Sequence, residues 1–204
     1  MRIVASNLSR TFGRMEVFRG VSFAAGKGMV LGITGRNGSG KTTLLKIAAG
    51  LLGPTTGTIS WSVGSTALEP RHVYRHIGFA APYLALYDDM TVEENLRFFA
   101  AMRGLRLEWN RIASFLDSVG LTAGREDPLR AFSSGMKQRV RLLFALLHDP
   151  PALLLDEPGT NLDEEGLDIV RGIVRSRRSI GPVLIATNDH ADIELCDGVI
   201  RLSD

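Results

Sequence analysis

The sequence is poor in cysteine and in long apolar runs. Its one cysteine, Cys196, cannot form an internal disulfide, and no group of Cys and His residues has the spacing of a zinc site. We therefore expect a reducing, cytosolic setting. No stretch reaches the roughly 18 apolar residues of a membrane span, and the N-terminus has no apolar run of signal-peptide length. If the protein works at a membrane, another protein must anchor it.

An excess of charge of one sign is also missing. The 204 residues include 24 Lys and Arg against 22 Asp and Glu, which gives a formal net charge of +2. This balance gives no reason to expect a nucleic-acid partner. Because 45% of the residues are hydrophobic and 23% charged, the chain has the composition of a globular protein with a sizeable core.

The first third of the chain predicts a strand, a glycine-rich turn and a helix. A helix from Lys41 to Leu52 carries apolar side chains nearly all round, which indicates burial, and Gly53-Pro54 ends it. Short apolar and β-branched runs bounded by turn residues predict strands. These strands are expected at Ile3–Ala5, Val21–Ala24, Met29–Thr34 and Thr58–Trp61.

The middle third predicts helices. A capping box at Thr91–Glu94 opens a helix that ends near Arg103, and a second helix covers about Glu108–Val119. We interpret this region as a helical subdomain, about 84–132, inserted into an α/β core. With no internal repeat or low-complexity linker, residues 1–204 are expected to form one domain.

The last third returns to an α/β pattern. A long helix is expected from Ser133 to His148, followed by the apolar strands Ala152–Leu155 and Val183–Ala186. Continuous apolar strands of this kind are typical of a parallel sheet covered on both faces. Leu167–Arg178 is the expected crossover helix between them.

The segment Gly35–Thr42 reads GRNGSGKT and matches the phosphate-binding loop pattern, with an expected strand before it and a helix after it. Such a loop surrounds a phosphate with backbone N–H groups, and the helix N-terminus adds roughly half a positive charge. Lys41 would reach the β- and γ-phosphates, and the Thr42 hydroxyl would bind Mg²⁺. A glycine turn with a merely exposed lysine is the alternative, which the strand and helix context disfavours. The nucleotide-binding residues expected here are Gly35, Asn37, Gly38, Ser39, Gly40, Lys41, Thr42 and Thr43.

Two carboxylates follow an apolar strand in Leu153–Glu157, where α/β sheets place their ligands. Asp156 is the expected magnesium partner, either as a direct ligand or through a bound water. Glu157 is the expected catalytic residue that polarises the attacking water, because phosphoryl transfer needs an oriented nucleophile. Taken alone, the pair could also cap the turn that follows.

Between these motifs, Phe132–Arg139 opens the long helix. Ser133 or Ser134 can cap the helix, and a helix N-terminus that carries serine and glycine can also bind a phosphate.

With these motifs in this order, the sequence resembles the nucleotide-binding subunit of ABC transporters over essentially the whole chain. Phe132–Met136 is similar to the family's LSGGQ signature, and Asn161–Asp163 to its D-loop. The resemblance implies a P-loop NTPase of the α/β class, with a mostly parallel core sheet, an N-terminal antiparallel β region and an inserted helical subdomain. The length and layout are loosely similar to the haem-exporter ATPase of cytochrome c maturation.

The resemblance also implies ATP and Mg²⁺ as cofactors, and a head-to-tail dimer in which ATP lies between one phosphate loop and the other copy's signature. Ser133 and Gly135 would act on the partner's nucleotide, and Asp163 would cross the dimer seam or simply cap a helix. Phe12 would stack on adenine, or would be a half-buried edge residue. The implied partners are an integral-membrane permease and a second ATP-binding subunit, identical or different, with the chain peripheral on the inner face of the cell membrane.

Two positions depart from the family pattern. Pro82 stands where most members carry a magnesium-binding glutamine, and the only glutamine in the sequence is Gln138. Asn188 stands where a histidine is usual; it can donate an amide hydrogen bond to the γ-phosphate but cannot carry a proton. His190 could substitute, although at that offset it more often starts the next helix.

Other functions stay open at this point. The chain could be a soluble ABC ATPase that acts on ribosomes or DNA, or a weakly hydrolysing nucleotide sensor. Tyr83, Tyr87, Phe98 and Phe99 are candidates to line a permease-docking groove. The sequence does not name the transported substrate or the direction of transport.

Overall fold

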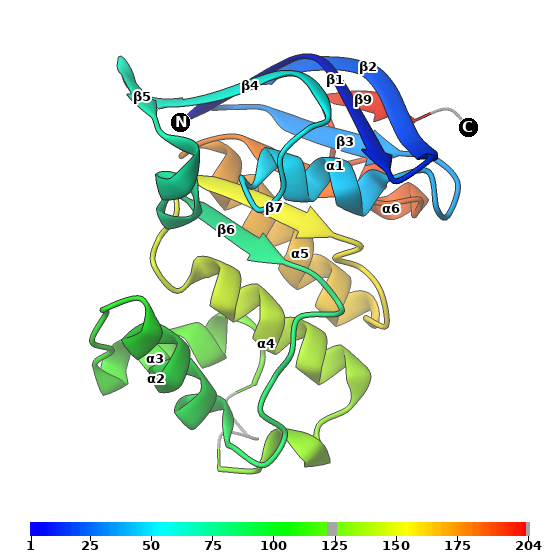
Figure 1. The fold of residues 1–204 in the computed structure, drawn as a ribbon. Helices are drawn as coiled ribbons and strands as arrows, with labels where there is room; N and C mark the ends of the chain where they lie inside the picture. Colours follow the sequence, from blue (N-terminus) through cyan, green and yellow to red (C-terminus); the bar gives the residue numbers. More distant parts are fainter. Residues whose placement is uncertain (122–125, 203–204) are drawn as a thin grey trace.

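Five short strands form the central sheet of the computed structural model, and all neighbouring pairs are parallel (Figure 1). Their order across the sheet is β6, β7, β8, β3, β9. The bounds are β3 (Val30–Thr34), β6 (Ile77–Ala80), β7 (Ala152–Asp156), β8 (Val183–Ala186) and β9 (Gly198–Arg201). The structure describes residues 1–121 and 126–202. The expected parallel core sheet is confirmed.

An antiparallel sheet, in the order β2, β1, β4, β5, covers one side of the molecule (Figure 1). Its strands are β1 (Arg2–Phe12), β2 (Met15–Ala25), β4 (Thr56–Val63) and β5 (Thr66–Leu68). This sheet is the N-terminal antiparallel region implied by the family resemblance.

Helix α1 (Lys41–Ala48) lies between the two sheets (Figure 1). Its buried Leu44 and Leu45 belong to one core cluster with Ile3 of the antiparallel sheet and Leu184 of the parallel sheet. Trp61 of β4 donates a hydrogen bond from its indole nitrogen to the Ala48 carbonyl at the end of α1, at 2.8 Å. The helix that begins at the phosphate loop is therefore held on both sides.

The opposite face of the parallel sheet packs against helices α4 (Ser134–Leu146) and α5 (Glu164–Arg178). Alternation along β7 explains how both faces are filled: Leu154 belongs to the α1 core, whereas Leu153 and Leu155 belong to the α4 and α5 core. A third core joins α2 (Val92–Met102) and α3 (Trp109–Ser118) to the outer side of α4 (Figure 1). Helix α6 (His190–Ile193) and two 3₁₀ helices, Pro70–Arg75 and Leu129–Ala131, complete the described elements.

Several predicted bounds were wrong. Strands β1 and β2 are each eleven residues long because they pair across a hairpin with their polar side chains exposed. Helix α1 ends before Leu52, since Gly50 takes a left-handed conformation (φ 71°) and donates to the Ile47 carbonyl. Helix α4 ends at Leu146 instead of His148, and α5 begins at Glu164, three residues earlier than expected.

The capping box of α2 is present as predicted, because Thr91 and Glu94 exchange side-chain hydrogen bonds with each other's backbone N–H. The region assigned to a helical subdomain, about 84–132, includes residues 122–125, which lie outside the described part of the chain. In the described ranges, every helix is either too short or too polar to cross a bilayer.

Candidate functional site

The segment Gly35–Thr42, which joins β3 to the first turn of α1, is the phosphate loop of the sequence prediction. Gly35 and Gly40 both need to be glycine here. At φ 95°, a Cβ on Gly40 would lie 2.4 Å from the Val17 side chain. A Cβ on Gly35 would lie 2.5 Å from Ser39 Oγ and 2.7 Å from the Leu202 carbonyl. The loop therefore turns tightly against the strands beside it.

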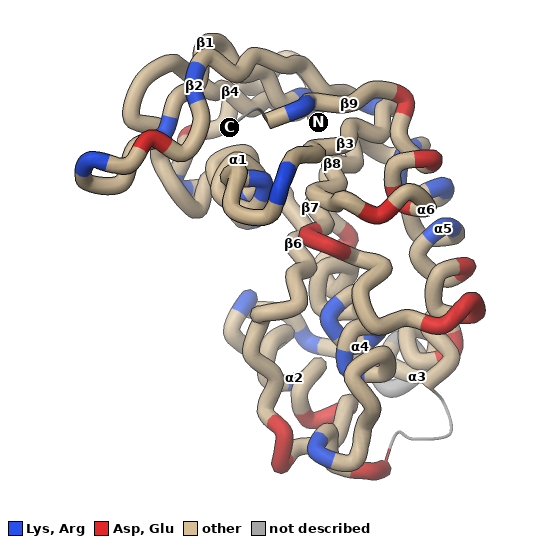
Figure 2. The backbone as a smooth tube through the Cα atoms, turned by 90° about the vertical axis from the view of Figure 1, so that its right-hand side faces the viewer, with Lys and Arg blue, Asp and Glu red and all other residues tan. Residues whose placement is uncertain are grey.

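Lys41 begins α1 and its ammonium is turned back over the loop. Its Nζ donates hydrogen bonds to the carbonyls of Gly35, at 2.8 Å, and Arg36, at 3.4 Å. It also lies 3.9 Å from Glu157 Oε1. The buried ammonium thus stands between the loop and Glu157, the residue that follows β7. In Figure 2 an acidic stretch of the tube lies at the end of β7, below the basic positions of α1.

The sheet register explains why Asp156 meets Thr42. Asp156 of β7 is level with Ala186 of β8, which is level with Ile33 of β3, so the carboxyl ends of these strands share one edge. The Thr42 hydroxyl donates to Asp156 Oδ2 at 2.7 Å. Burial raises the pKa of the Asp156 carboxyl, and the hydrogen bond from Thr42 opposes that shift.

Two buried oxygens beside Thr42 and the phosphate loop have no hydrogen-bond partner among the described residues. They are Asp156 Oδ1 and Ser39 Oγ. A carboxylate and a hydroxyl are the hard oxygen donors that Mg²⁺ prefers, and this ion keeps several of its own waters. The residues present therefore fit a magnesium ion at Thr42 and Asp156.

Glu157 adopts a left-handed backbone conformation, φ 46°, which is unusual for a residue with a Cβ. Its N–H donates to the Ala186 carbonyl at 2.7 Å, and its carboxylate accepts a hydrogen bond from Thr187 at 3.3 Å. Burial raises the pKa of Glu157, while the charge of Lys41 opposes the rise. This strained turn directs the side chain toward the phosphate loop instead of leaving it to cap the turn that follows.

Asn188 follows β8 and spans the phosphate loop. Its Oδ1 accepts from the Gly35 N–H and its Nδ2 donates to Asn37 Oδ1, each at 3.3 Å. His190 begins α6, as its position suggested, with its ring 90% exposed and 3.5 Å from Glu194. The structure thus brings Asn188, and not His190, to the loop.

A cavity of about 410 Å³ lies over the phosphate loop. The Phe12 ring, 45% exposed, forms part of its wall, with the Arg10 guanidinium 4.3 Å from the ring centroid. Met15 and Val17, across the β1–β2 turn, add apolar wall that the sequence prediction missed; their place in the strand after Phe12 was the available signal. The predicted residues that line this cavity are Phe12, Asn37, Gly38, Gly40, Lys41, Thr42, Thr43 and Glu157.

Ser133, Gly135 and Asp163 do not line this cavity. They line a separate hollow of about 330 Å³ at the start of α4 and α5. Ser133 caps α4 by accepting from the Met136 N–H. Asp163 caps α5 by accepting from the Gly166 N–H, and it also accepts from Arg139 at 2.6 Å. These contacts hold the pKa of Asp163 below its ordinary value.

Residues 18–160 match the family described as ABC transporter. A linearmycin resistance ATP-binding protein of Bacillus subtilis is 32% identical over 199 residues, which cover 96% of this chain and 64% of that protein. The cytochrome c biogenesis ATP-binding export protein CcmA of Nitrosomonas europaea is 33% identical over 189 residues, 91% of this chain and 87% of that protein. A solved ATP-binding subunit of an ABC transporter superposes with a TM-score of 0.85 at 28% identity, covering 99% of this chain and 86% of that one.

Proposed function

Because this chain belongs to the ABC transporter family of ATP-binding proteins, we propose that it energises transport by hydrolysing ATP between two facing ATP-binding domains docked on a separate membrane subunit. The observation that carries the proposal is the 2.7 Å hydrogen bond from Thr42 to Asp156, with Lys41 3.9 Å from Glu157. It joins the phosphate loop to the two carboxylates at one sheet edge, which is the arrangement that phosphoryl transfer requires.

In this proposal ATP occupies the cavity over the phosphate loop. Phe12 stacks on the adenine, and the backbone of the loop with Lys41 holds the phosphates. Thr42 and Asp156 hold Mg²⁺, which neutralises phosphate charge when bound. Pro82 offers the ion no ligand.

Hydrolysis would then depend on two further side chains. Glu157 accepts a hydrogen bond from the attacking water and orients it; its raised pKa makes it a better proton acceptor than an exposed carboxylate. Asn188 turns its amide from Asn37 toward the γ-phosphate as a neutral donor. Because an amide cannot carry a proton, slow turnover is expected, and a weakly hydrolysing nucleotide sensor is the second candidate that this residue favours.

A facing copy completes the site. Ser133 and Gly135 lie at the N-terminus of a thirteen-residue helix, where a phosphate is stabilised by the helix dipole, yet they line a different hollow from Lys41. We therefore assign them, with Asp163 at the seam, to the nucleotide of a second ATP-binding subunit, which is either another copy or a different chain.

A groove of about 510 Å³ between the end of α1, β6 and α2 is the proposed docking surface for the membrane subunit. Tyr87 and Phe99, two of the residues predicted for such a groove, line it, whereas Tyr83 and Phe98 do not. Its other apolar lining residues include Leu51, Phe79, Leu84, Leu86, Met102 and Phe144. Docking there would place the chain on the inner face of the cell membrane. Residues 1–204 would act as one ATP-binding domain, with a helical subdomain at about 84–132. This proposal involves no nucleic acid.

Nucleotide titrations test the proposal. Lys41→Ala removes the ammonium that the loop holds, and we expect the affinity for ATP to fall about tenfold or more. Lys27→Ala, at an exposed position outside the site, is the matched control and should bind ATP like the unaltered chain. Equal affinity of the two variants would contradict the proposed nucleotide site.

A further inference from the structure

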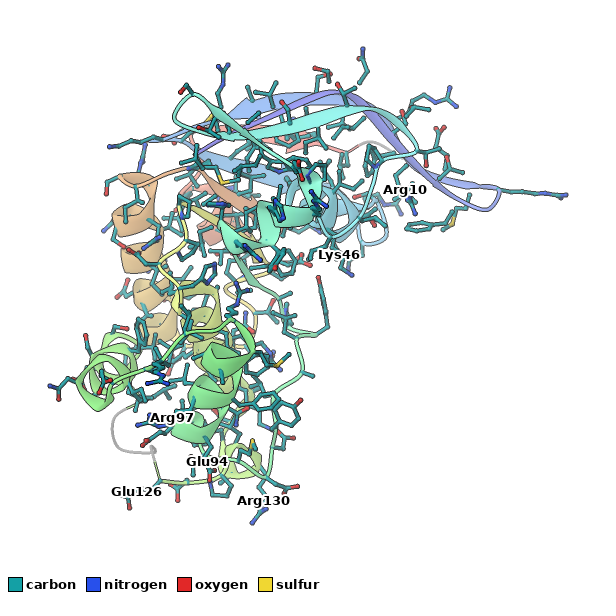
Figure 3. All side chains as sticks on the ribbon, turned by 60° about the vertical axis from the view of Figure 1, so that its left-hand side comes forward. Arg10, Lys46, Glu94, Arg97, Glu126 and Arg130 are labelled. Carbon is teal, nitrogen blue, oxygen red and sulfur yellow. The ribbon has the colours of Figure 1, made fainter. Side chains whose placement is uncertain are left out.

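Phe12, the ring assigned to adenine, has a cation beside it from the same strand. Leu8, Arg10 and Phe12 are each two residues apart in β1, so their side chains share one face of the antiparallel sheet. Buried Leu8 belongs to the core that contains α1, and Figure 3 shows Arg10 on the side of the sheet that α1 covers. The guanidinium carbon of Arg10 lies 4.3 Å from the centroid of the Phe12 ring, which is within the range of a cation–π contact.

The guanidinium covers one face of the ring and leaves the other face to the cavity. Among the described residues, Phe12 lines the cavity over the phosphate loop and Arg10 does not. The Phe12 ring is exposed, so a flat group can lie against it. The Arg10 Nε is buried and has no hydrogen-bond partner in the part of the chain that the structure describes, as expected of a guanidinium plane that stacks on an aromatic ring. A base in the cavity would therefore meet a ring that already carries a cation on its other face.

Two hydrogen bonds tie this part of β1 to the turn that follows α1. Arg10 Nη1 donates to the Gly53 carbonyl at 2.9 Å. The N–H of the next residue, Thr11, donates to Thr55 Oγ1 at 3.0 Å. Because α1 begins in the phosphate loop, Arg10 connects the Phe12 ring to the helix whose first turn is assigned to the phosphates.

We propose that Arg10 is a positioning residue of the nucleotide site, whose guanidinium holds the Phe12 ring against the cavity and strengthens the stacking of a base on its free face. This inference rests on the proposed function. The ring loses little rotational freedom when a base binds, because the guanidinium already restricts it. The cation also draws the π-electron density of the ring toward itself, so the free face repels the π-electrons of a base less strongly. Both effects act on a stacked base and not on a phosphate chain.

Calorimetric titrations with ATP and with inorganic tripolyphosphate, both without Mg²⁺, separate the contribution of the base from that of the phosphates. Arg10→Gln removes the charge and the stacked guanidinium. We expect it to raise the dissociation constant of ATP about two- to fivefold and to leave that of tripolyphosphate unchanged. Arg14→Gln, at an exposed position in the turn between β1 and β2, is the matched control. It removes the same charge from the same hairpin and should leave both constants as they are in the unaltered chain.

A double-mutant cycle with Phe12→Leu tests whether the effect of Arg10 acts through the ring. Leucine has no π face, so Arg10→Gln should cause no further loss of ATP affinity in that background. The inference is overturned by an equal loss in both backgrounds, by an ATP constant that Arg10→Gln leaves unchanged or improves, or by an equal loss for ATP and tripolyphosphate. Failure of the unaltered chain to bind ATP, or unaltered ATP binding in Phe12→Leu, would overturn the proposed nucleotide site instead.

Discussion

At the scale of single residues, the site is set by burial and by short polar contacts. Asp156 and Glu157 are adjacent in sequence, yet the left-handed turn at Glu157 sends their carboxylates to different partners, Thr42 and Thr187. Burial raises the pKa of both, and the charge of Lys41 opposes the rise. Asp156 therefore suits a metal ion, and Glu157 suits a water molecule.

Asn188 gives the first prediction. Its amide is the polar group after β8 that contacts the phosphate loop, so we expect Asn188→Ala to lower steady-state ATPase turnover by about tenfold or more. Asn188→His, which restores a side chain able to share a proton, should raise turnover above that of the unaltered chain. Identical rates for all three proteins would mean that Asn188 makes no functional contact.

His148 predicts how stability depends on pH. Burial, followed by the charge of Arg103 3.4 Å away, lowers the pKa of His148 to about 4, against 6.5 for the unperturbed group. Between these values the unfolded chain binds a proton that the folded chain does not. The free energy of unfolding should therefore fall by about 1–2 kcal/mol from pH 7 to pH 5 through this residue.

Urea unfolding at the two pH values measures this loss. His148→Gln should reduce the fall between pH 7 and pH 5, whereas His190→Gln, at a ring that is 90% exposed, should leave it as it is. The same pH dependence in the unaltered chain and in His148→Gln would refute the assignment.

At the scale of elements, the local motifs were predictable and the long-range contacts were not. The phosphate loop and the capping box at Thr91 were predicted in place, because each depends on residues within one turn. Ser133 and Asp163 cap their helices, each as one of two alternatives that the sequence left open. The full length of β1 and β2 was missed because their pairing uses alternating polar residues across a hairpin.

Contacts between elements that are far apart in the sequence could not be predicted either. Nothing in the local pattern shows that the chain leaves β6 next to Asp156, since this depends on β6 lying beside β7 in the sheet. Strand β5, three residues long and largely exposed, carries too few buried residues to give a sequence signal. The aromatic residues of the groove were only partly predicted, because Phe98 turns toward Tyr87, with ring centroids 4.9 Å apart, and does not line the groove.

The junction of α4 and α5 gives an element-scale prediction. A Cβ on Gly135 would lie 2.7 Å from the Asn161 carbonyl, so Gly135→Ala must push the start of α4 away from the loop before α5. We expect a loss of about 1–3 kcal/mol in the free energy of unfolding, together with lower ATPase turnover, while ATP binding to the single chain is kept. Urea unfolding, ATPase and nucleotide-binding assays measure the three quantities.

Gly172→Ala is the matched control, because that glycine is in α5 with open space around it. It should be neutral or slightly stabilising and should keep full activity. Loss of ATP binding in Gly135→Ala would place this residue in the chain's own nucleotide site and contradict its assignment to a facing copy.

At the scale of the whole molecule, the described chain forms one core on each face of the parallel sheet and a third core around α2, α3 and the outer side of α4. The nucleotide cavity lies at one edge of the sheet, and the groove lies between the end of α1, β6 and α2. The hollow that contains Ser133 and Asp163 is separate from that cavity. In the proposed mechanism, a single chain therefore presents two incomplete halves of a site. Two copies arranged head to tail would join them, which is the central claim of the proposed mechanism.

Sedimentation of Glu157→Gln with Mg²⁺ and saturating ATP tests this claim most directly. The amide keeps the shape of the side chain but cannot take a proton, so ATP should persist and hold two subunits together. We expect a particle of about twice the mass of one chain, formed by this chain alone or with a second ATP-binding subunit that copurifies with it. When Lys41→Ala is combined with Glu157→Gln, we expect only the single chain. A Glu157→Gln protein that binds ATP fully and still sediments as a single chain, with or without that second subunit, would contradict it.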